Sequence, residues 1–306
     1  MTSSSYELIV VGEGAAGLTA ARVAARLGMR TATFEAVLFG GLITNINHLD
    51  PAPSSEEPPV ASGADLGADL YTASVEAGAE SIGQNVTSLS RDADGFVVRT
   101  EESEYRAAQV VIASGARLRL LGVPGETEFV GRGVSQCADC DGPMFHGKEV
   151  VVVGGGDSAL QEALALAEYC AQVHLVHRDD KFSGRDDLVA RVSSHKKIRI
   201  LWGRSVAAIE GEKTVERVRL VGSDGASSTM PIAGVFAYVG LEPNVAFLPK
   251  EVAVDPMGRV TVNEQLESTI PGLFAAGIVR AGCGGTVDDA IQDGRMAARS
   301  VVSHRR

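Results

Sequence analysis

Two cysteines separated by two residues stand in the segment SQCADCDG, residues 135–142. Cys137 and Cys140 are close enough to form a small disulfide at a turn or at the start of a helix, a spacing typical of thiols that cycle between two oxidation states. Asp141 follows directly and can protonate a departing thiolate. The sequence therefore predicts a redox-active dithiol with Cys137, Cys140 and Asp141 as its catalytic residues.

Two structural alternatives to a redox dithiol are half of a zinc site and two unconnected buried cysteines. A structural zinc site needs four ligands. The remaining cysteines, Cys170 and Cys283, stand alone in the sequence, without a second CxxC or a His pair. We therefore expect no bound metal.

Length and composition narrow the class of protein. The chain has 306 residues, more than one usual domain, so two domains are expected. A formal net charge of −11 offers no basic face, and we expect no nucleic-acid partner. Four cysteines suit a reducing compartment. No apolar stretch approaches the roughly 20 residues of a membrane helix, and the apolar run 8–11 fits a strand better than a signal peptide. These features predict a cytoplasmic protein without membrane contact.

A first glycine pattern follows the apolar run ELIVV, which is typical of a buried parallel strand. Gly12 permits a tight turn, Gly14 lets the backbone approach a pyrophosphate, and Gly17 lets an alanine-rich helix pack closely on the strand. A second strand, 31–34, ends at Glu35, where an acid suits the ribose hydroxyls of an adenosine. This order predicts a dinucleotide site. The later loop 39–42 (FGGL) either approaches a flat ring system or is an ordinary loop.

A second glycine pattern follows the expected strand 148–153. It contains Gly154 and Gly156, with Ala159 at the third position, an allowed variant. A helix over 160–170 and a strand over 173–176 complete a second nucleotide-binding unit. Further short strands are expected at 206–209, 215–220, 230–232 and 235–239, a turn at 240–244, and a final helix at 287–302.

The segment HRDDK, residues 177–181, lies where such a unit reads the adenosine ribose. A 2′-phosphate calls for cations and a 2′-hydroxyl calls for a carboxylate. Arg178 and Lys181 offer the first, and Asp179 and Asp180 offer the second. The choice between NADPH and NADH stays open, and a solvated loop without a ligand is the alternative.

Two dinucleotide patterns with a CxxC between them resemble the low-molecular-weight thioredoxin reductases, which depend on FAD and NADPH. The resemblance runs from about Tyr6 to Ala298. It rests on Gly12-x-Gly14-x-x-Gly17, Ala113-Ser114-Gly115-Ala116, the segment 131–135, Cys137-Ala-Asp-Cys140-Asp141-Gly142, Gly154-Gly-Gly156-Asp157-Ser158-Ala159, His177-Arg178 and the segment 272–277.

The resemblance implies an α/β fold with two Rossmann-like domains, the second inserted in the first. Residues 1–116 and 243–306 would form the FAD domain, and 117–242 the pyridine-nucleotide domain that carries the CxxC. It also implies a homodimer that acts on a thioredoxin-like protein or a small disulfide. Cys140 would be the sulfur beside the flavin, Cys137 the nucleophile toward the partner, and Asp141 the proton donor.

Two sets of cofactor-binding residues follow from the glycine patterns and the resemblance together. For FAD they are Gly12, Gly14, Ala15, Ala16, Gly17, Glu35, Gly40, Gly41, Leu42, Asn47, Val86, Ala113, Ser114, Gly115, Gly277, Ile278, Gly285, Thr286 and Val287. For the nicotinamide nucleotide they are Gly154, Gly156, Asp157, Ser158, Ala159, His177, Arg178 and Asp179.

The chain departs from the family pattern at four places. Asp179 and Ser183 replace arginines, which weakens the case for NADPH because a carboxylate repels a 2′-phosphate. Ile278 follows Gly277 in place of an aspartate, Gly285-Thr286 replaces an Arg-Gln pair, and the loop after Gly41 is shorter.

These departures keep two further functions open. One is an FAD and dithiol enzyme with another electron partner, either a ferredoxin-linked reductase or an oxygen-dependent dithiol oxidase. The other is a redox-sensing flavoprotein, against which the intact CxxC-Asp argues, since a binding module needs no proton donor beside a dithiol.

Overall fold

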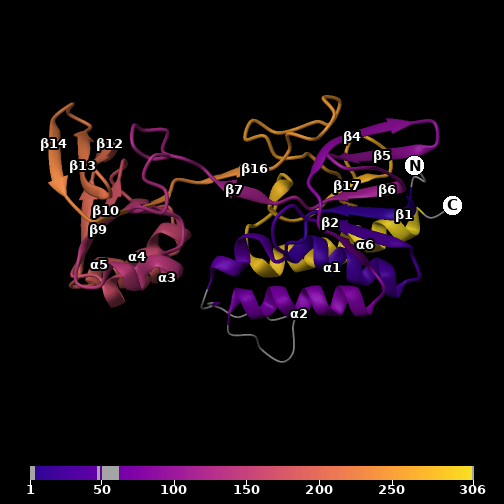
Figure 1. Ribbon diagram of the computed structural model, residues 1–306, viewed down its shortest axis with the longest axis horizontal. Coiled ribbons are helices and arrows are strands. Elements are labelled where there is room, and N and C mark those ends of the chain that lie inside the picture. Colours follow the sequence, from indigo (N-terminus) through magenta and orange to yellow (C-terminus); the bar gives the residue numbers. More distant parts are fainter. Residues whose placement is uncertain (1–3, 47–48, 50–61, 305–306) are drawn as a thin grey trace. The chain divides into compact units, whose positions relative to one another are not determined.

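The computed structural model describes residues 4–46, 49 and 62–304, so Asn47 lies outside the described residues. The chain divides into two compact units. The first unit consists of Met1–Arg117 and Glu242–Arg306, and the second of Leu118–Leu241. The colours of Figure 1 show that the first unit takes both ends of the chain and the second unit its middle.

The first unit is built on a seven-stranded sheet with the order β3-β2-β1-β6-β5-β4, and β17 also pairs with β6. Its strands are β1 (Ser4–Val11), β2 (Thr31–Phe34), β3 (Glu80–Ile82), β4 (Val86–Asp92), β5 (Gly95–Thr100), β6 (Glu104–Ile112) and β17 (Leu273–Ala275). The strand β6 serves two neighbours on one side, because residues 104–107 pair antiparallel with β5 and residues 110–112 pair parallel with β17. The antiparallel excursion β4–β5 thus leaves the parallel core of the sheet intact.

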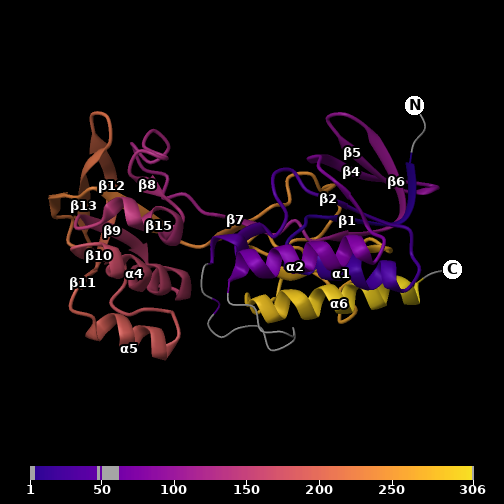
Figure 2. The same ribbon diagram turned by 60° about the horizontal axis from the view of Figure 1, so that its bottom comes forward.

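Three helices accompany this sheet: α1 (Ala15–Arg26), α2 (Gly63–Glu76) and α6 (Val287–Ser303). Both views show them packed as one group, with α1 in contact with α2 and α6 (Figures 1 and 2). A Cβ on Gly294 of α6 would lie 2.3 Å from the carbonyl oxygen of Ala16 in α1, so glycine permits the close approach of these two helices. Their packing fixes the helix that follows the first glycine turn.

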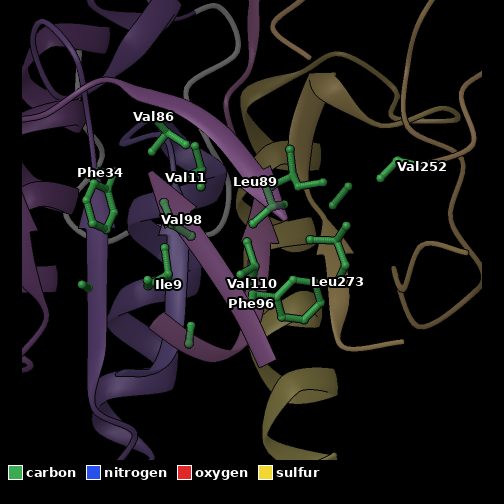
Figure 3. Packing of buried hydrophobic residues seen from close by; sticks show 14 of the residues in the cluster. Ile9, Val11, Phe34, Val86, Leu89, Phe96, Val98, Val110, Val252 and Leu273 are labelled. Atoms are coloured by element: carbon green, nitrogen blue, oxygen red, sulfur yellow. The ribbon is translucent and has the colours of Figure 1, made fainter. Parts of the chain in front are cut away.

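Branched and aromatic side chains from the sheet fill the core of the first unit. Ile9, Phe34, Val98, Val110 and Leu273 come from five different strands and are at most 1 % exposed. Figure 3 shows these side chains gathered in one cluster across the strands. Burial of this much apolar surface is the main stabilising contribution to the unit.

The second unit has a parallel five-stranded sheet in the order β11-β10-β9-β15-β8 and an antiparallel three-stranded sheet, β12-β13-β14. Its strands are β8 (Val134–Ser135), β9 (Glu149–Gly154), β10 (Gln172–His177), β11 (Ile198–Trp202), β12 (Arg204–Gly211), β13 (Val215–Gly222), β14 (Ser227–Pro231) and β15 (Gly234–Tyr238). Its helices are α3 (Ala138–Asp141), α4 (Asp157–Tyr169) and α5 (Asp186–Ser194). Short 3₁₀ turns in the two units are η1 (Gly41–Asn45), η2 (Gly142–Phe145) and η3 (Gly277–Val279).

Alternate residues of β9 belong to two different cores. Val150 and Val152 pack with the α4 side, and Val151 and Val153 pack with the three-stranded sheet. All four are buried. A strand covered on both faces reads as a continuous apolar run, which is why the sequence indicates β9 so clearly.

The predicted α/β fold with two Rossmann-like parts, one inserted in the other, is confirmed. The turn predicted over 240–244 is wrong for Leu241–Pro243, which form the strand β16 and pair with β7 (Ala116–Leu118). An ion pair of 3.1 Å joins Arg117 of β7 to Glu242 of β16. A strand of three residues carries no alternating pattern, and its partner lies far away in the sequence, so local reasoning missed it.

Candidate active site

The two cysteines of the CxxC form a disulfide at the start of the short helix α3, with their Cα atoms 5.3 Å apart. Cys137 is the N-cap of α3, and its Sγ lies 3.1 Å from the backbone N–H of Cys140, which donates to it. The hydroxyl oxygen of Ser135 accepts the N–H of Cys137 at 3.1 Å. Cys140 is exposed and Cys137 is half-buried. The structure therefore brings together the two predicted sulfurs at an accessible position.

Asp141 ends α3 and is half-buried. Its backbone N–H donates to the carbonyl of Cys137 at 3.1 Å, so the helical turn holds the acid directly after Cys140. Gly142 follows with no room for a side chain, since a Cβ there would lie 3.0 Å from the ring of Tyr169. The turn after the dithiol is thereby packed against α4.

A carboxyl group that sequence reasoning missed lies under this turn. Glu162 of α4 accepts the backbone N–H of Ala138 at 2.9 Å and the hydroxyl of Tyr238 at 3.0 Å, both on Oε2. Burial raises the pKa of Glu162 to about 7, the two hydrogen bonds oppose this rise, and the nearby Asp139 adds to it. Burial and the Glu162 carboxylate also raise the pKa of Tyr238 far above its usual value.

The glycines of the first pattern fulfil different requirements. Gly12 has φ +105°, and a Cβ there would lie 2.3 Å from the carbonyl oxygen of Ala113. A Cβ on Gly17 would lie 2.0 Å from the carbonyl oxygen of Gly12. On Gly14, by contrast, it would meet nothing closer than the Gly40 carbonyl oxygen at 3.9 Å. Protein packing thus explains Gly12 and Gly17, and the open space at Gly14 fits a pyrophosphate at the N-terminus of α1.

The predicted ribose-binding acid lies beside this glycine turn. Glu35 accepts the backbone N–H of Glu13 at 3.2 Å and that of Ala36 at 2.8 Å. Glu13 itself is buried, and its Oε1 accepts the hydroxyls of Thr33 at 2.5 Å and Ser81 at 2.6 Å. Sequence reasoning missed Glu13 because only the fold brings Thr33 and Ser81 to the turn.

The loop after β2 returns to the same turn. The N–H of Gly40 donates to the carbonyl of Glu13 at 2.6 Å, and Gly14 and Gly40 form an isolated bridge. Gly41 and Leu42 begin η1, and Leu42 is 36 % exposed. The loop 39–42, expected either to approach a ring system or to be an ordinary loop, therefore lies next to Gly14, the glycine predicted to meet the pyrophosphate.

Ala15 and Ala16 begin α1, and four further predicted FAD residues lie at strand ends. Val86 begins β4, and its side chain is in the core, so only its backbone is available to a ligand. Ala113, Ser114 and Gly115 follow the end of β6, where the Ser114 hydroxyl donates to the carbonyl of Asn244 at 2.7 Å.

The last of the predicted FAD residues lie in the segment before α6 and at its start. Gly277 has φ +78° and donates its N–H to Asp293 at 2.9 Å. Thr286 caps α6 by accepting the N–H of Asp289 at 3.1 Å, and Asp289 in turn accepts the N–H of Thr286 at 3.0 Å. Ile278 is half-buried in η3. Gly285 and Val287 flank the cap, so the predicted residues lie at both ends of one loop.

A groove of about 1500 Å³ opens along the second glycine pattern. Gly154 and Gly156 lie in its wall, and a Cβ on Gly156 would meet nothing closer than the Ser183 hydroxyl at 3.9 Å. Gly156 is thus as open as Gly14, and the space beside it fits the phosphates of a dinucleotide at the N-terminus of α4. All of the predicted nucleotide residues, namely Gly154, Gly156, Asp157, Ser158, Ala159, His177, Arg178 and Asp179, line this groove.

The charges at the ribose end of the groove are mixed. The Nε of Arg178 lies 3.5 Å from the carboxylate of Asp179, and both side chains are largely exposed. Arg185, which the sequence analysis did not single out, binds Asp187 at 2.9 Å. Arg178 and Arg185, two cations of this groove, thus have carboxylates beside them.

No group of three or more His, Cys, Asp or Glu side chains suited to hold a metal occurs among residues 4–46, 49 and 62–304. Over the same residues, no helix is long and apolar enough to cross a membrane.

Comparison with known proteins agrees with this geometry. The family model described as pyridine nucleotide-disulphide oxidoreductase matches residues 6–294. The chain is 35 % identical over 302 residues to a thioredoxin reductase of Treponema pallidum, covering 98 % of this chain and 97 % of that one. It is 36 % identical over 298 residues to the thioredoxin reductase of Bacillus subtilis, covering 97 % and 93 %. The crystal structure of the Lactococcus lactis thioredoxin reductase superposes with a TM-score of 0.92 at 32 % identity, covering 97 % and 98 %.

The chain belongs to the pyridine nucleotide-disulphide oxidoreductases and, within them, to the low-molecular-weight thioredoxin reductase family. It is accordingly an FAD- and nicotinamide-dependent oxidoreductase with a redox disulfide, Cys137–Cys140. The resemblance inferred from the motifs is confirmed.

Proposed function

We propose that this chain reduces the disulfide of a thioredoxin-like protein with electrons that pass from NADPH or NADH through FAD to Cys137–Cys140. The observation that carries the proposal is the disulfide at the start of α3, with Cys140 exposed. A small disulfide is the second class of substrate. Relatives of this chain named thioredoxin reductase support the first class.

FAD would bind the first unit, which we take as the FAD domain. The N-terminus of α1 and the open position at Gly14 would hold the pyrophosphate, and Glu35 would bind the adenosine ribose. Bound FAD supplies a two-electron carrier between the nucleotide and the disulfide. The other residues assigned to it are Gly12, Ala15, Ala16, Gly17, Gly40, Gly41, Leu42, Asn47, Val86, Ala113, Ser114, Gly115, Gly277, Ile278, Gly285, Thr286 and Val287.

The nicotinamide nucleotide would bind the groove of the second unit. Gly156 and the N-terminus of α4 would receive its phosphates, and Arg178 with Asp179 would face its ribose. Because a cation and a carboxylate stand together there, the site favours neither NADPH nor NADH strongly.

The two sulfurs would have separate roles. We assign Cys140 to the flavin side and Cys137 to the partner. The Cys137 thiolate attacks one sulfur of the partner disulfide, a mixed disulfide forms, and a partner thiolate leaves with a proton supplied by Asp141. Cys140 then attacks the sulfur of Cys137, which restores the internal disulfide and releases the reduced partner. Two electrons leave the chain in each cycle.

We also propose that the enzyme is a cytoplasmic homodimer without nucleic-acid contacts. The motif resemblance supports the dimer, and the formal net charge of −11 disfavours nucleic acid.

Anaerobic titration of the FAD-loaded protein tests the proposed route. Addition of NADPH or NADH should bleach the flavin, and a thioredoxin disulfide added afterwards should be reduced in proportion. The carboxylate of Asp179, which lies 3.5 Å from the Arg178 guanidinium, favours one competing function: an FAD and dithiol enzyme served by a ferredoxin or by oxygen. Flavin that neither nucleotide bleaches would contradict the proposed route and favour that function instead.

A further inference from the structure

Three elements of the second unit meet at one oxygen atom beneath the redox helix. Oε2 of Glu162, on α4, accepts the N–H of Ala138 on α3 at 2.9 Å and the hydroxyl of Tyr238 on β15 at 3.0 Å. Ala138 is fully buried and directly follows Cys137. The carboxyl group is thus hydrogen-bonded to the backbone of the CxxC itself.

We propose that Glu162 is a positioning residue of the redox centre, which takes up a proton when the Cys137–Cys140 disulfide is reduced and releases it when the disulfide re-forms. Tyr238 holds the carboxyl in place for this role. The inference rests on the proposed function of Cys137–Cys140 as the electron-carrying dithiol.

The surroundings of Glu162 make its charge sensitive to events at the sulfurs. Among the described residues, the titratable groups that act on it are Tyr238 from β15 and Asp139 from α3. Asp139 adds a like charge, and burial disfavours ionisation, so the pKa of Glu162 is raised to about 7. A thiolate on Cys137, the residue before Ala138, would be a further negative charge near this largely buried carboxyl, and it would favour the protonated form.

The proton balance follows directly. Reduction breaks the S–S bond and adds two electrons. If both sulfurs become thiols, it also adds two protons. Where one sulfur stays a thiolate, the second proton resides on Glu162 instead. Attack of that thiolate on the partner disulfide removes its charge, and Glu162 then returns its proton to solvent. The reductant is the reduced flavin of the proposed function.

The test measures thiolate formation in the FAD-loaded protein after anaerobic reduction by dithiothreitol and removal of the excess. Alkylation rates of Cys137 and Cys140 with iodoacetamide are followed from pH 5 to 9, with each cysteine resolved by peptide mass spectrometry. The wild-type profile should show two steps, as expected for groups coupled by about one pKa unit or more. Glu162→Gln keeps the size and the acceptor oxygen but cannot ionise, and should give one step, shifted down by about one pKa unit.

Two further variants complete the test. Glu168→Gln changes an exposed glutamate on the same helix and should leave the wild-type profile unchanged. Tyr238→Phe removes one hydrogen bond to the carboxylate, so the Glu162 step should move to higher pH, and this variant decides the matter if Glu162→Gln fails to fold.

Profiles of Glu162→Gln or Tyr238→Phe that superpose on the wild type would overturn the inference. Activity of the wild-type enzyme with thioredoxin is measured in parallel. If that activity is present while the profiles superpose, only the role of Glu162 is rejected. If the wild type fails to reduce thioredoxin, the proposed function is rejected on separate grounds.

Discussion

Arg280 binds the carboxylate of Asp293 through two hydrogen bonds, from Nε to Oδ2 and from Nη2 to Oδ1, each 2.6 Å long. The Asp293 side chain is 6 % exposed, and it also accepts the N–H of Gly277. Hydrogen bonding of the guanidinium to Asp293 raises the pKa of Arg280 above its usual value. The pair therefore ties η3 to α6 within the segment of the first unit that we assign to the flavin.

The first prediction concerns this buried pair. Asp293→Asn leaves the guanidinium without a charge partner, and removing one member of such a pair typically costs about 3–5 kcal/mol. The free energy of unfolding, measured by urea titration, should therefore fall by an amount in that range. Glu104→Gln, which breaks the exposed pair with Arg99, is the control and should cost about 1 kcal/mol or less. Equal losses in the two variants would contradict the argument.

The second prediction separates ligand binding from packing at the first glycine turn. Gly14→Ala places a Cβ in open space, so the apoprotein should lose less than about 1 kcal/mol, the usual scale of N-cap changes. Its FAD affinity should fall about tenfold or more, because the Cβ occupies the approach of the pyrophosphate. Apoprotein thermal unfolding and FAD titration measure the two effects.

Gly17→Ala is the matched comparison. Its Cβ would lie 2.0 Å from the Gly12 carbonyl oxygen, so α1 must move and the apoprotein itself should be strongly destabilised. A Gly14→Ala protein that binds FAD as tightly as the wild type would refute the assignment of this turn.

Local patterns made much of the fold predictable. The strand expected at 31–34 is Thr31–Phe34, and the final helix expected at 287–302 is Val287–Ser303. By contrast, α5 was not anticipated, because in its nine residues only Leu188 and Val192 are buried. Two apolar positions in so short a segment do not establish a helical period.

The site shows the same division between local and distant information. The CxxC and both glycine turns are contiguous in sequence, so their residue types reveal them. The pair of Glu162 and Tyr238 joins residues 76 positions apart, and that of Arg280 and Asp293 depends on a loop folding back on its helix. Such contacts form only when the strands are ordered into a sheet, and no spacing in the sequence predicts them.

The third prediction concerns the choice of nucleotide. Asp179 stands 3.5 Å from the Arg178 guanidinium, so the wild type should discriminate poorly between NADPH and NADH. Asp179→Arg removes a carboxylate and adds a cation, and should shift preference toward NADPH. The measurement is kcat/KM with NADPH and with NADH, for the wild type and for Asp179→Arg. If the wild-type catalytic efficiencies with the two nucleotides differ by more than about 4 kcal/mol, the scale set by unpaired buried polar groups, this prediction is contradicted.

The fourth prediction distinguishes the two sulfurs. Because Cys140 is the sulfur proposed to face the flavin, Cys137→Ser should leave it as a single thiolate against oxidised flavin and give a long-wavelength charge-transfer band above neutral pH. Cys140→Ser should lack that band but should trap a mixed disulfide with the partner through Cys137. Both variants should lose turnover. Equal absorption spectra, or activity in either variant, would mean that these cysteines are not the redox centre.

Asp141→Asn provides the comparison for the sulfur variants. It should keep FAD binding and slow the thiol–disulfide step by roughly 10²–10⁴-fold, as expected on losing a positioned acid. Rapid-reaction kinetics of the step with thioredoxin measure this effect. An unchanged rate would assign the proton transfer to another group.

The fifth prediction uses the raised pKa of Glu162 as a stability measurement. The pKa of Glu162 in the folded protein is raised to about 7 by burial, whereas the usual value of a glutamate is 4.5, so the folded state binds more protons between these pH values. Stability therefore falls as pH rises from about 5 to 8, by up to about 3 kcal/mol from this group. Glu162→Gln cannot ionise and should not show this loss of stability. Its free energy of unfolding should therefore rise relative to that of the wild type as the pH increases. Urea unfolding at pH 5 and pH 8 measures the difference, with Glu168→Gln as the exposed control on the same helix. If the wild type and Glu162→Gln change in parallel with pH, the carboxyl does not carry a proton near neutrality, and its coupling to the sulfurs loses its physical basis.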